Sequence, residues 1–261
     1  VHAWKICFNL GNGSAARQRL AAAGRLQRTA TGQTRDWLCP SHPENRKQEA
    51  DVAREMLVKY PDLAGVHLDF IRFPGSDTCF CDTCRRGFEA AIGKRVSPWP
   101  GAVRGGDALS QHWQAYRRAV ITDTVKQVAL AAHRVKPDAR ISVAVFSNWL
   151  TARDTVAQDW VAWAKENYVD FVCPMDYHAD AAALRTDVAR QMALAKDSGV
   201  RVYPGIGLST GKLDALETMR QINVTRTART GGFVLFEYDA REALDVLPEL
   251  APAMGQTRAS R

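Results

Sequence analysis

The sequence predicts an α/β fold with a parallel sheet, and a (β/α)8 barrel of the TIM type fits it best. Six strand-like segments alternate with amphipathic helices along the 261 residues, a pattern typical of a parallel sheet covered by helices. No Gly-rich phosphate loop follows a strand-like segment, which argues against a doubly wound nucleotide-binding sheet. Acidic and aromatic residues recur at the ends of these segments, where barrels of this type carry their sites.

The expected strands are short apolar segments, and they cover residues 1–10, 64–70, 140–146, 170–175, 200–206 and 232–238. The expected helices have apolar stripes or helix-forming compositions, and they cover residues 14–28, 43–60, 83–92, 109–135, 155–167, 181–198, 212–229 and 241–247. Six strands are two fewer than a closed barrel needs. Either two strands precede Val1, or they lie unrecognised in residues 11–40 and 93–108.

The composition indicates which class of protein this is and which partners it is expected to lack. The chain is 46% hydrophobic and 24% charged, as in ordinary globular proteins, and no apolar run approaches the ~20 residues of a membrane span. The net charge of +7 could favour nucleic acid or an acidic polysaccharide, but the basic residues are scattered and no nucleic-acid-binding motif is present. We therefore expect no nucleic-acid partner and no membrane span. The residues indicate neither a signal segment nor an oligomeric state.

The first catalytic candidate is Asp69, which ends the strand-like segment 64–70 and is followed by a turn signal. A carboxylate at the carboxyl end of a parallel strand lies where such folds place active sites. Alternation puts His67 on the same face, so His67 could hydrogen-bond to Asp69 and tune its pKa. Alternatively, Asp69 pairs with Arg72 or caps a turn. Arg72 itself either binds substrate hydroxyls or is a structural ion-pair partner.

A cysteine cluster follows this strand. Cys79, Cys81 and Cys84 lie within one short stretch, and Cys39 could join them from an earlier loop. Four thiolates form a closed tetrahedral set for a structural Zn²⁺, with no open position for water. The alternatives are one disulfide with spare thiols, or free thiols in a reducing compartment.

Seven short segments occur in the order in which they occur in the glycosyl-hydrolase-like family 10 barrels, which the chain resembles. They are HAW (2–4), WLCPSHPENR (37–46), GVHLDFIRFP (65–74), ISVAVF (141–146), QDW (158–160), PMDY (174–177) and GGFVLFEYD (231–239). The resemblance implies a glycosidase barrel and an exported, periplasmic or extracellular, protein. HAW resembles the family's third barrel strand, which implies that the first two β/α units are missing from this chain.

Two further resemblances bear on the sites. The cysteine spacing is similar to the four-cysteine zinc site of family-42 β-galactosidases, which strengthens Cys39 as the fourth ligand. A weaker resemblance to family-18 chitinases fails at two positions: Ile71 stands where the proton donor would be, and His178 replaces the Asp that follows the tyrosine. The chitinase mechanism is therefore not expected.

Glycoside hydrolysis needs a proton donor and a second carboxylate. Asp69 is the expected donor, and the candidates for its partner are Asp176, then Glu237, then Asp239, or a carboxylate elsewhere in the chain. Alternation turns Asp176 sideways, with its neighbours facing inward. Residues at or near strand ends are the candidates for substrate binding, with barrel-core packing as the alternative for the aromatic ones: Trp4, His67, Arg72, Tyr177, His178, Tyr238 and Asp239.

These observations predict a glycoside hydrolase that acts on an unidentified polysaccharide or oligosaccharide by carboxylate acid/base chemistry. The alternatives are a non-catalytic carbohydrate-binding barrel and a zinc-stabilised scaffold domain. We expect one barrel domain over residues 1–250, with a zinc-binding loop insertion near 73–93 and a flexible tail at 251–261. The sugar, its linkage and the retaining or inverting outcome do not follow from these residues.

Overall fold

The computed structural model describes residues 1–11 and 15–255. The expected helix start at Ser14 and the tail residues 256–261 lie outside the described residues. The chain divides into two compact units, one of Val1–Ala144 with Trp149–Asp170 and one of Val145–Asn148 with Phe171–Arg261. Each unit is described by itself, and the single domain over residues 1–250 stays a prediction.

The first unit contains a parallel sheet in the order β1 (His2–Ile6), β4 (Gly65–Asp69) and β5 (Arg140–Phe146), of which residues 140–144 belong to this unit. These strands confirm three of the expected ones. Val66, Leu68, Ile141 and Val143 are fully buried, as expected for a parallel sheet with covered faces. Gly65 permits the close approach of β4 to β5, since a Cβ atom there would overlap the carbonyl oxygen of Arg140.

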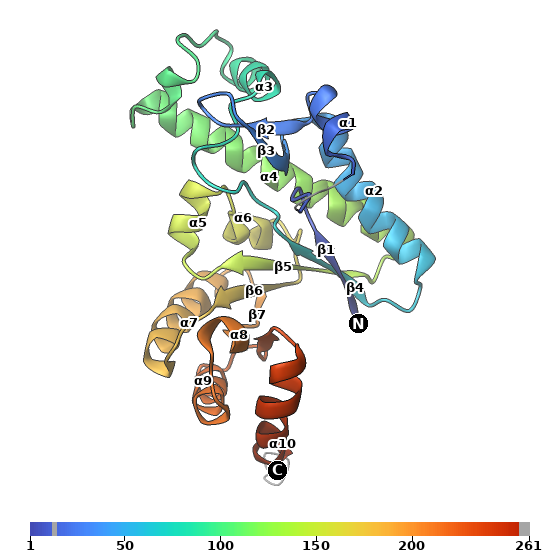
Figure 1. Cartoon of the computed structure of the whole chain (residues 1–261), viewed down its shortest axis with the longest axis vertical. Helices are drawn as coiled ribbons and strands as arrows, with labels where there is room; N and C mark the ends of the chain where they lie inside the picture. The colour runs from blue at the N-terminus through green and yellow to red at the C-terminus, as the bar shows by residue number, and fades with distance from the viewer. Residues whose placement is uncertain (12–14, 256–261) are drawn as a thin grey trace. The chain divides into compact units, whose positions relative to one another are not determined.

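Helices α2 (Pro43–Lys59) and α4 (Ala108–Val135) lie side by side in this unit (Figure 1). Both confirm expected helices, and Pro43 occupies the first turn of α2, where its missing N–H costs nothing. A buried ion pair joins Lys5 of β1 to Glu49 of α2, and Glu49 Oε1 also accepts from the Phe8 amide at 2.9 Å. These contacts fix β1 against α2.

The segment between β1 and α2 holds one helix, as expected within 14–28, but a shorter one, and also a hairpin that was not expected. It forms α1 (Arg17–Ala22) and a separate antiparallel hairpin of β2 (Leu26–Arg28) and β3 (Thr34–Leu38). Gly32 makes the turn with φ of 82°, a conformation that glycine adopts without steric cost. Strands were therefore missed in residues 11–40, but they do not extend the parallel sheet.

The rest of the first unit consists of α3 (Asp82–Ile92), the 3-10 turn Gly101–Val103, α5 (Trp149–Thr155) and α6 (Trp160–Lys165). The expected helix over 155–167 is thus the shorter α6, and α5, which precedes it, was not expected. Ala157 has φ of 62° between them, which breaks the helical path. Asp159 caps α6 by accepting from the Ala162 amide at 3.4 Å.

The second unit holds parallel strands β6 (Phe171–Asp176), β7 (Arg201–Val202), β8 (Gly205–Gly207) and β9 (Val234–Phe236). The expected strand 200–206 is divided between β7 and β8, with Pro204, which has no N–H for the ladder, in the gap. The helices are α7 (Ala181–Ala195), α8 (Leu208–Gly211), α9 (Ala215–Thr227), the π-helical turn Glu242–Val246 and α10 (Leu247–Gly255).

The core of this unit lies between its strands and helices and contains Leu184, Val188, Ile206, Ile222, Val246 and Leu250. The last helix was expected to end at Leu247, but α10 continues to Gly255 and so includes part of the expected tail. The alternation of parallel strands and helices in both units confirms the α/β class. Among the described residues, no helix is both long and apolar enough to cross a membrane.

Candidate functional site

Asp69 lies at the carboxyl end of β4, as predicted, and both of its carboxylate oxygens accept hydrogen bonds. Oδ1 accepts from the Phe70 amide at 2.7 Å and Oδ2 from Trp4 Nε1 at 3.2 Å. Burial raises the pKa of Asp69, while these two donors and the charge of Arg72 oppose the shift. A carboxyl group with a raised pKa is suited to donate a proton near neutral pH.

His67 does not bond to Asp69, so that expectation is wrong for this structure. Its Nδ1 lies 2.9 Å from Ser142 Oγ, and His2 Nδ1 lies at the same distance from the same oxygen. One hydroxyl proton serves only one ring nitrogen, so at least one of the two rings carries its proton on Nδ1. Burial lowers the pKa of His67 to about 4, which keeps this ring neutral beneath the acid.

Arg72 stacks on aromatic rings at the end of β4. Its guanidinium carbon lies 5.4 Å from the centre of the Trp37 ring and 5.1 Å from that of Phe70, and Nη1 donates to the Phe73 carbonyl oxygen at 3.2 Å. Such cation–π contacts hold the side chain in a fixed place. Arg72 thus connects the Asp69 loop to the β2–β3 hairpin.

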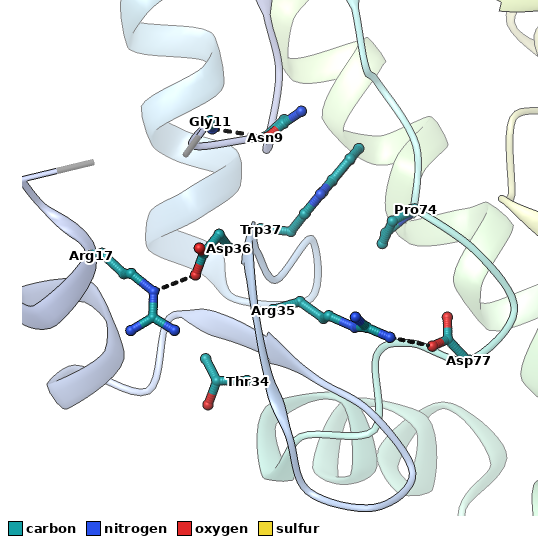
Figure 2. A pocket seen from close by; sticks show the side chains of 9 residues that line it. All are labelled: Asn9, Gly11, Arg17, Thr34, Arg35, Asp36, Trp37, Pro74 and Asp77. Carbon is teal, nitrogen blue, oxygen red and sulfur yellow. Dashed lines mark hydrogen bonds and ion pairs between the residues drawn. The ribbon is translucent and has the colours of Figure 1, made fainter. Parts of the chain in front are cut away.

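An open cleft of about 560 Å³ lies beyond the end of β1 (Figure 2). Trp37 and Pro74 form part of its lining, and two ion pairs border it, Arg17 with Asp36 and Arg35 with Asp77 at 3.0 Å. Aromatic faces together with paired charges are a common way to bind sugar rings and hydroxyls. The sequence did not predict this cleft, because the hairpin of β2 and β3 that forms part of it was not recognised. Trp37 itself lies in the segment WLCPSHPENR (37–46), which resembles the family.

The four predicted zinc ligands come together in the first unit. The Sγ atoms of Cys39, Cys79, Cys81 and Cys84 all lie within 4.8 Å of one another. Cys39 Sγ lies 3.5 Å from Cys81 Sγ and 3.4 Å from Cys84 Sγ, far longer than a disulfide bond of about 2.05 Å. Tetrahedral Zn²⁺ with bonds of about 2.3 Å places its sulfur ligands about 3.8 Å apart. The donor set and its spacing therefore fit zinc.

The cysteine cluster is enclosed by packed side chains. Cys39, Cys79 and Cys84 have no exposed surface, and Ser41 Oγ contacts both Cys84 Sγ and the Tyr116 hydroxyl at 3.2 Å. Aromatic rings pack beside the loop, including Phe80, Phe88, Trp99 and Trp113. A site buried in this way has no room for substrate.

In the second unit, Asp176 is turned away from its neighbours on the strand, as alternation predicted. It has 0% exposed surface, and Oδ1 accepts from Gln191 Nε2 of α7 at 2.7 Å. Burial, followed by the charge of Asp187, raises the pKa of Asp176 to about 8. Because a sugar cannot reach a carboxyl group with no exposed surface, this position argues against Asp176 as the second catalytic carboxylate.

The other candidates of this unit lie at the ends of β6 and β9. Tyr177 packs against Phe236 with ring centres 5.6 Å apart, and Tyr238 is 78% exposed. Glu237 is exposed. Asp239 Oδ1 accepts from the amides of Arg241 at 2.8 Å and of Glu242 at 3.3 Å, which makes it a cap of the following helical turn.

His178 binds a residue that the sequence reading missed. Its Nε2 lies 2.9 Å from Asp187 Oδ2 of α7, and the ligand atoms of Asp176, His178 and Asp187 lie within 4.8 Å of one another. Asp187 gave no sequence signal, because it is one polar residue of an ordinary amphipathic helix. Its contact with His178 depends on how α7 packs beside the end of β6.

Residues 18–220, more than half of the chain, match the family described as Glycosyl hydrolase-like 10. The chain belongs to this family. The glycosyl hydrolase-like 10 resemblance is thereby confirmed, and its match covers Asp69 and Asp176 but not Glu237. No curated protein matches this chain by sequence.

Solved glycosidases are similar in structure to this glycosyl hydrolase-like 10 chain. The catalytic domain of a β-amylase from Paenibacillus polymyxa has a TM-score of 0.68 at 12% identity, covering 91% of this chain and 76% of that chain. A GH42 β-galactosidase from G. stearothermophilus has a TM-score of 0.60 at 13% identity, covering 91% and 41%. An α-L-fucosidase from Paenibacillus thiaminolyticus has a TM-score of 0.62 at 13% identity, covering 99% and 37%.

Identities this low establish the fold alone. The similarity confirms the predicted TIM-type class, since these structures are barrel glycosidases. The chain spans 76% of the β-amylase domain but less than half of the β-galactosidase and of the fucosidase. The activities of those complete enzymes therefore enter only as proposals for this chain.

Proposed function

We propose that this chain is a glycoside hydrolase in which Asp69 donates the proton to the leaving oxygen. The observation that supports this most is the place of Asp69: the end of a parallel strand, with a pKa raised by burial and a carboxylate held by Trp4 and Phe70. Hydrogen bonds to both oxygens hold the carboxyl group in one orientation, and a fixed position is what general acid catalysis needs.

Glu237 is the proposed second carboxylate, acting as nucleophile or as the base that activates water. The candidates for this role were three named carboxylates and a carboxylate elsewhere in the chain, and the choice here is among the named ones. Asp176 has no exposed surface, and Asp239 is occupied in capping a helical turn. Glu237 is exposed at the end of β9, so its oxygens are accessible to a sugar or a water molecule.

The cleft at Trp37 is the proposed sugar subsite of the first unit. A sugar ring presents C–H groups to an aromatic face and hydroxyls to charged groups, and Trp37, Arg35 and Asp77 offer both kinds of contact. Trp4 is 62% exposed beside Asp69 and provides a second platform. Arg72, Tyr177, Tyr238 and His178 stay proposals for substrate binding.

A panel of glycans tests the proposed hydrolysis. We suggest starch, β-galactans and fucosylated oligosaccharides, chosen from the substrates that the names of the similar structures indicate, together with acidic polysaccharides that would suit the net charge of +7. Release of reducing ends by the wild-type chain, and its loss in Asp69→Asn, is the expected result. Asn keeps the shape and one acceptor of Asp69 but cannot donate an acidic proton.

The matched control is Asp62→Asn, which makes the same change at an exposed position outside the strand. This variant is expected to hydrolyse as the wild type does. Equal hydrolysis by Asp69→Asn and Asp62→Asn would refute the role of Asp69. Binding of a glycan without hydrolysis by the wild-type chain would instead support the second candidate function, a non-catalytic carbohydrate-binding barrel, which the exposed Trp4 and the Trp37 cleft also favour.

We propose further that Cys39, Cys79, Cys81 and Cys84 hold one structural Zn²⁺. The support is the spacing of their sulfur atoms and the burial of the cluster. Four protein ligands would satisfy the metal without water, so its role would be to fix the loop of residues 73–93 beside the Asp69 strand. This role is compatible with a hydrolase and with a carbohydrate-binding scaffold.

A further inference from the structure

The second unit contains three buried acceptor oxygens that no donor satisfies. Asp176 Oδ2, Gln191 Oε1 and Gln221 Oε1 have no hydrogen-bond partner among the described residues, and all three residues are at most 1% exposed. A buried acceptor without a donor costs about 1–3 kcal/mol, so three of them together call for an explanation.

The two glutamines bond to Asp176 and to the backbone of His178. Gln191 Nε2 donates to Asp176 Oδ1 at 2.7 Å, and Gln221 Nε2 donates to the His178 carbonyl oxygen at 3.0 Å. Both amide nitrogens are therefore engaged in hydrogen bonds, and these bonds fix the orientation of the two side-chain amides. The amide oxygens are left without a donor. Of the three residues, Asp176 belongs to a group of potential metal ligands, and a cation would satisfy the lone pairs of its unpaired oxygen.

We propose that Asp176, His178 and Asp187 bind a divalent transition-metal cation of the Mn²⁺ or Zn²⁺ class. Each offers one ligand atom, and these atoms lie within 4.8 Å of one another. Ligands bound at about 2.1 Å lie about 3 Å apart when adjacent and about 4.2 Å apart when opposite. The spacing therefore accommodates one ion with small movements of the side chains.

The ligand chemistry selects the class of metal. Two carboxylate oxygens and one imidazole nitrogen suit Mn²⁺ and Zn²⁺ better than Mg²⁺, which prefers oxygen ligands and water. His178 Nε2 lies 2.9 Å from Asp187 Oδ2, the separation expected of two adjacent ligands on one ion.

Neighbouring groups support the ligands. Arg190 Nη1 donates to Asp187 Oδ1 at 2.9 Å, which leaves Oδ2 for the metal, and Gln191 holds Asp176 in the same way through Oδ1. Contacts of this kind orient metal ligands in proteins. The ion would join the end of β6 to α7, with its remaining positions open to water. Asp176 and Asp187 have no role in the proposed hydrolysis, and none of the three ligands belongs to the cysteine cluster.

A titration with Mn²⁺ tests the proposal, because Mn²⁺ has little affinity for thiolates and its free aqueous ion has a strong electron paramagnetic resonance (EPR) signal. The purified chain is first dialysed against a weak chelator to remove loosely bound cations. We expect about one equivalent of Mn²⁺ to bind below about 1 mM. Pulsed EPR is expected to show coupling to one ¹⁴N nucleus, that of His178.

Two variants locate the site, and one serves as the control. His178→Gln and Asp187→Asn are expected to weaken Mn²⁺ binding at least about tenfold, and His178→Gln is expected to remove the ¹⁴N coupling. Asp197→Asn, at an exposed position of the same unit, is expected to bind as the wild type does. Gln at 178 can still donate to Asp187, so this variant decides the result if Asp187→Asn does not fold by circular dichroism.

The proposal is overturned by any of three results. The first is that the wild-type chain binds no Mn²⁺ below about 1 mM. The second is that His178→Gln binds Mn²⁺ with the affinity of the Asp197→Asn control. The third is that the ¹⁴N coupling persists in His178→Gln, which would place the bound ion at another histidine.

Discussion

Trp4 Nε1 donates to Asp69 Oδ2 at 3.2 Å, from the strand beside the one that carries the acid. The contact joins two residues that the sequence separates by 65 positions, and it turns the N–H edge of an exposed indole toward the proposed proton donor. A donor to the ionised form of a carboxyl group favours ionisation, so Trp4 opposes the effect of burial on the pKa of Asp69.

Trp4→Phe is therefore expected to raise the pKa of Asp69 further, since it removes the N–H donor and keeps an aromatic ring. The basic limb of the pH profile of kcat/KM, on which the acid must stay protonated, should move to higher pH. The rate at the optimum should fall by less than about tenfold, because the acid itself remains.

Trp149→Phe is the matched control, since Trp149 Nε1 donates to Asp159 at 2.9 Å away from the proposed acid. This variant should leave the profile unchanged. A Trp4→Phe profile that coincides with that of the wild type would show that the hydrogen bond does not tune the acid.

Among the three candidates for the second catalytic carboxylate, only Glu237 is expected to cause a large loss of kcat when it is substituted. Glu237→Gln is expected to lower kcat by about 10³-fold or more, because it removes a carboxylate that acts directly on the sugar or the water. Asp176→Asn and Asp239→Asn should keep kcat within about tenfold of the wild type in folded protein. A large loss in Asp176→Asn, with a normal thermal transition, would contradict the assignment.

His67 gives a prediction for stability against pH. Its pKa is lowered to about 4 by burial, so between pH 4 and 6.5 the unfolded chain binds more protons than the folded chain. The free energy of unfolding should fall as the pH drops through this window, by up to roughly 3 kcal/mol from this group. Above about pH 6.5 the contribution is complete and constant.

Urea unfolding at several pH values measures this slope. His67→Gln should show a smaller slope between pH 4 and 6.5 than the wild type, whereas His112→Gln, at an exposed position, should retain the wild-type slope. If His67→Gln and the wild type have the same slope, the neutral His67 of the structure is not the state in solution.

Metal analysis checks the cysteine cluster. We expect close to one zinc per chain, and we expect Cys39→Ser and Cys84→Ser to lose it and to melt about 10 °C or more below the wild type. Cys173→Ser changes a buried thiol outside the cluster and should keep its zinc. Zinc-free wild-type protein with six reactive thiols after unfolding would exclude the metal.

Much of the fold followed from residue patterns. The strand ending at Asp69 and helices α2 and α4 were predicted within two residues of their ends, because their periodicity is long and uninterrupted. The hairpin of β2 and β3 was missed, since its strands are short and polar and its turn depends on one glycine in a left-handed conformation.

The positions of site residues could be predicted only where they follow from the residue pattern of a single strand. The alternation of residues in β6 predicted that Asp176 faces the opposite side from its neighbours on the strand. The turn signal after β4 predicted that Asp69 lies at the carboxyl end of that strand. The partner of His67 was not predictable, because Ser142 lies on a strand 75 residues away. Asp187 was missed for the same reason, since its meeting with His178 depends on tertiary packing of a helix.

Leaving-group dependence tests the central claim, that Asp69 is the proton donor. The measurement compares kcat/KM of the wild type and of Asp69→Asn on a substrate with a poor leaving group and on an aryl glycoside whose leaving group needs no proton. Asp69→Asn should lose about 10²–10⁴-fold on the first substrate and little on the second. An equal loss on both substrates, or no loss on either, would contradict the assignment of Asp69.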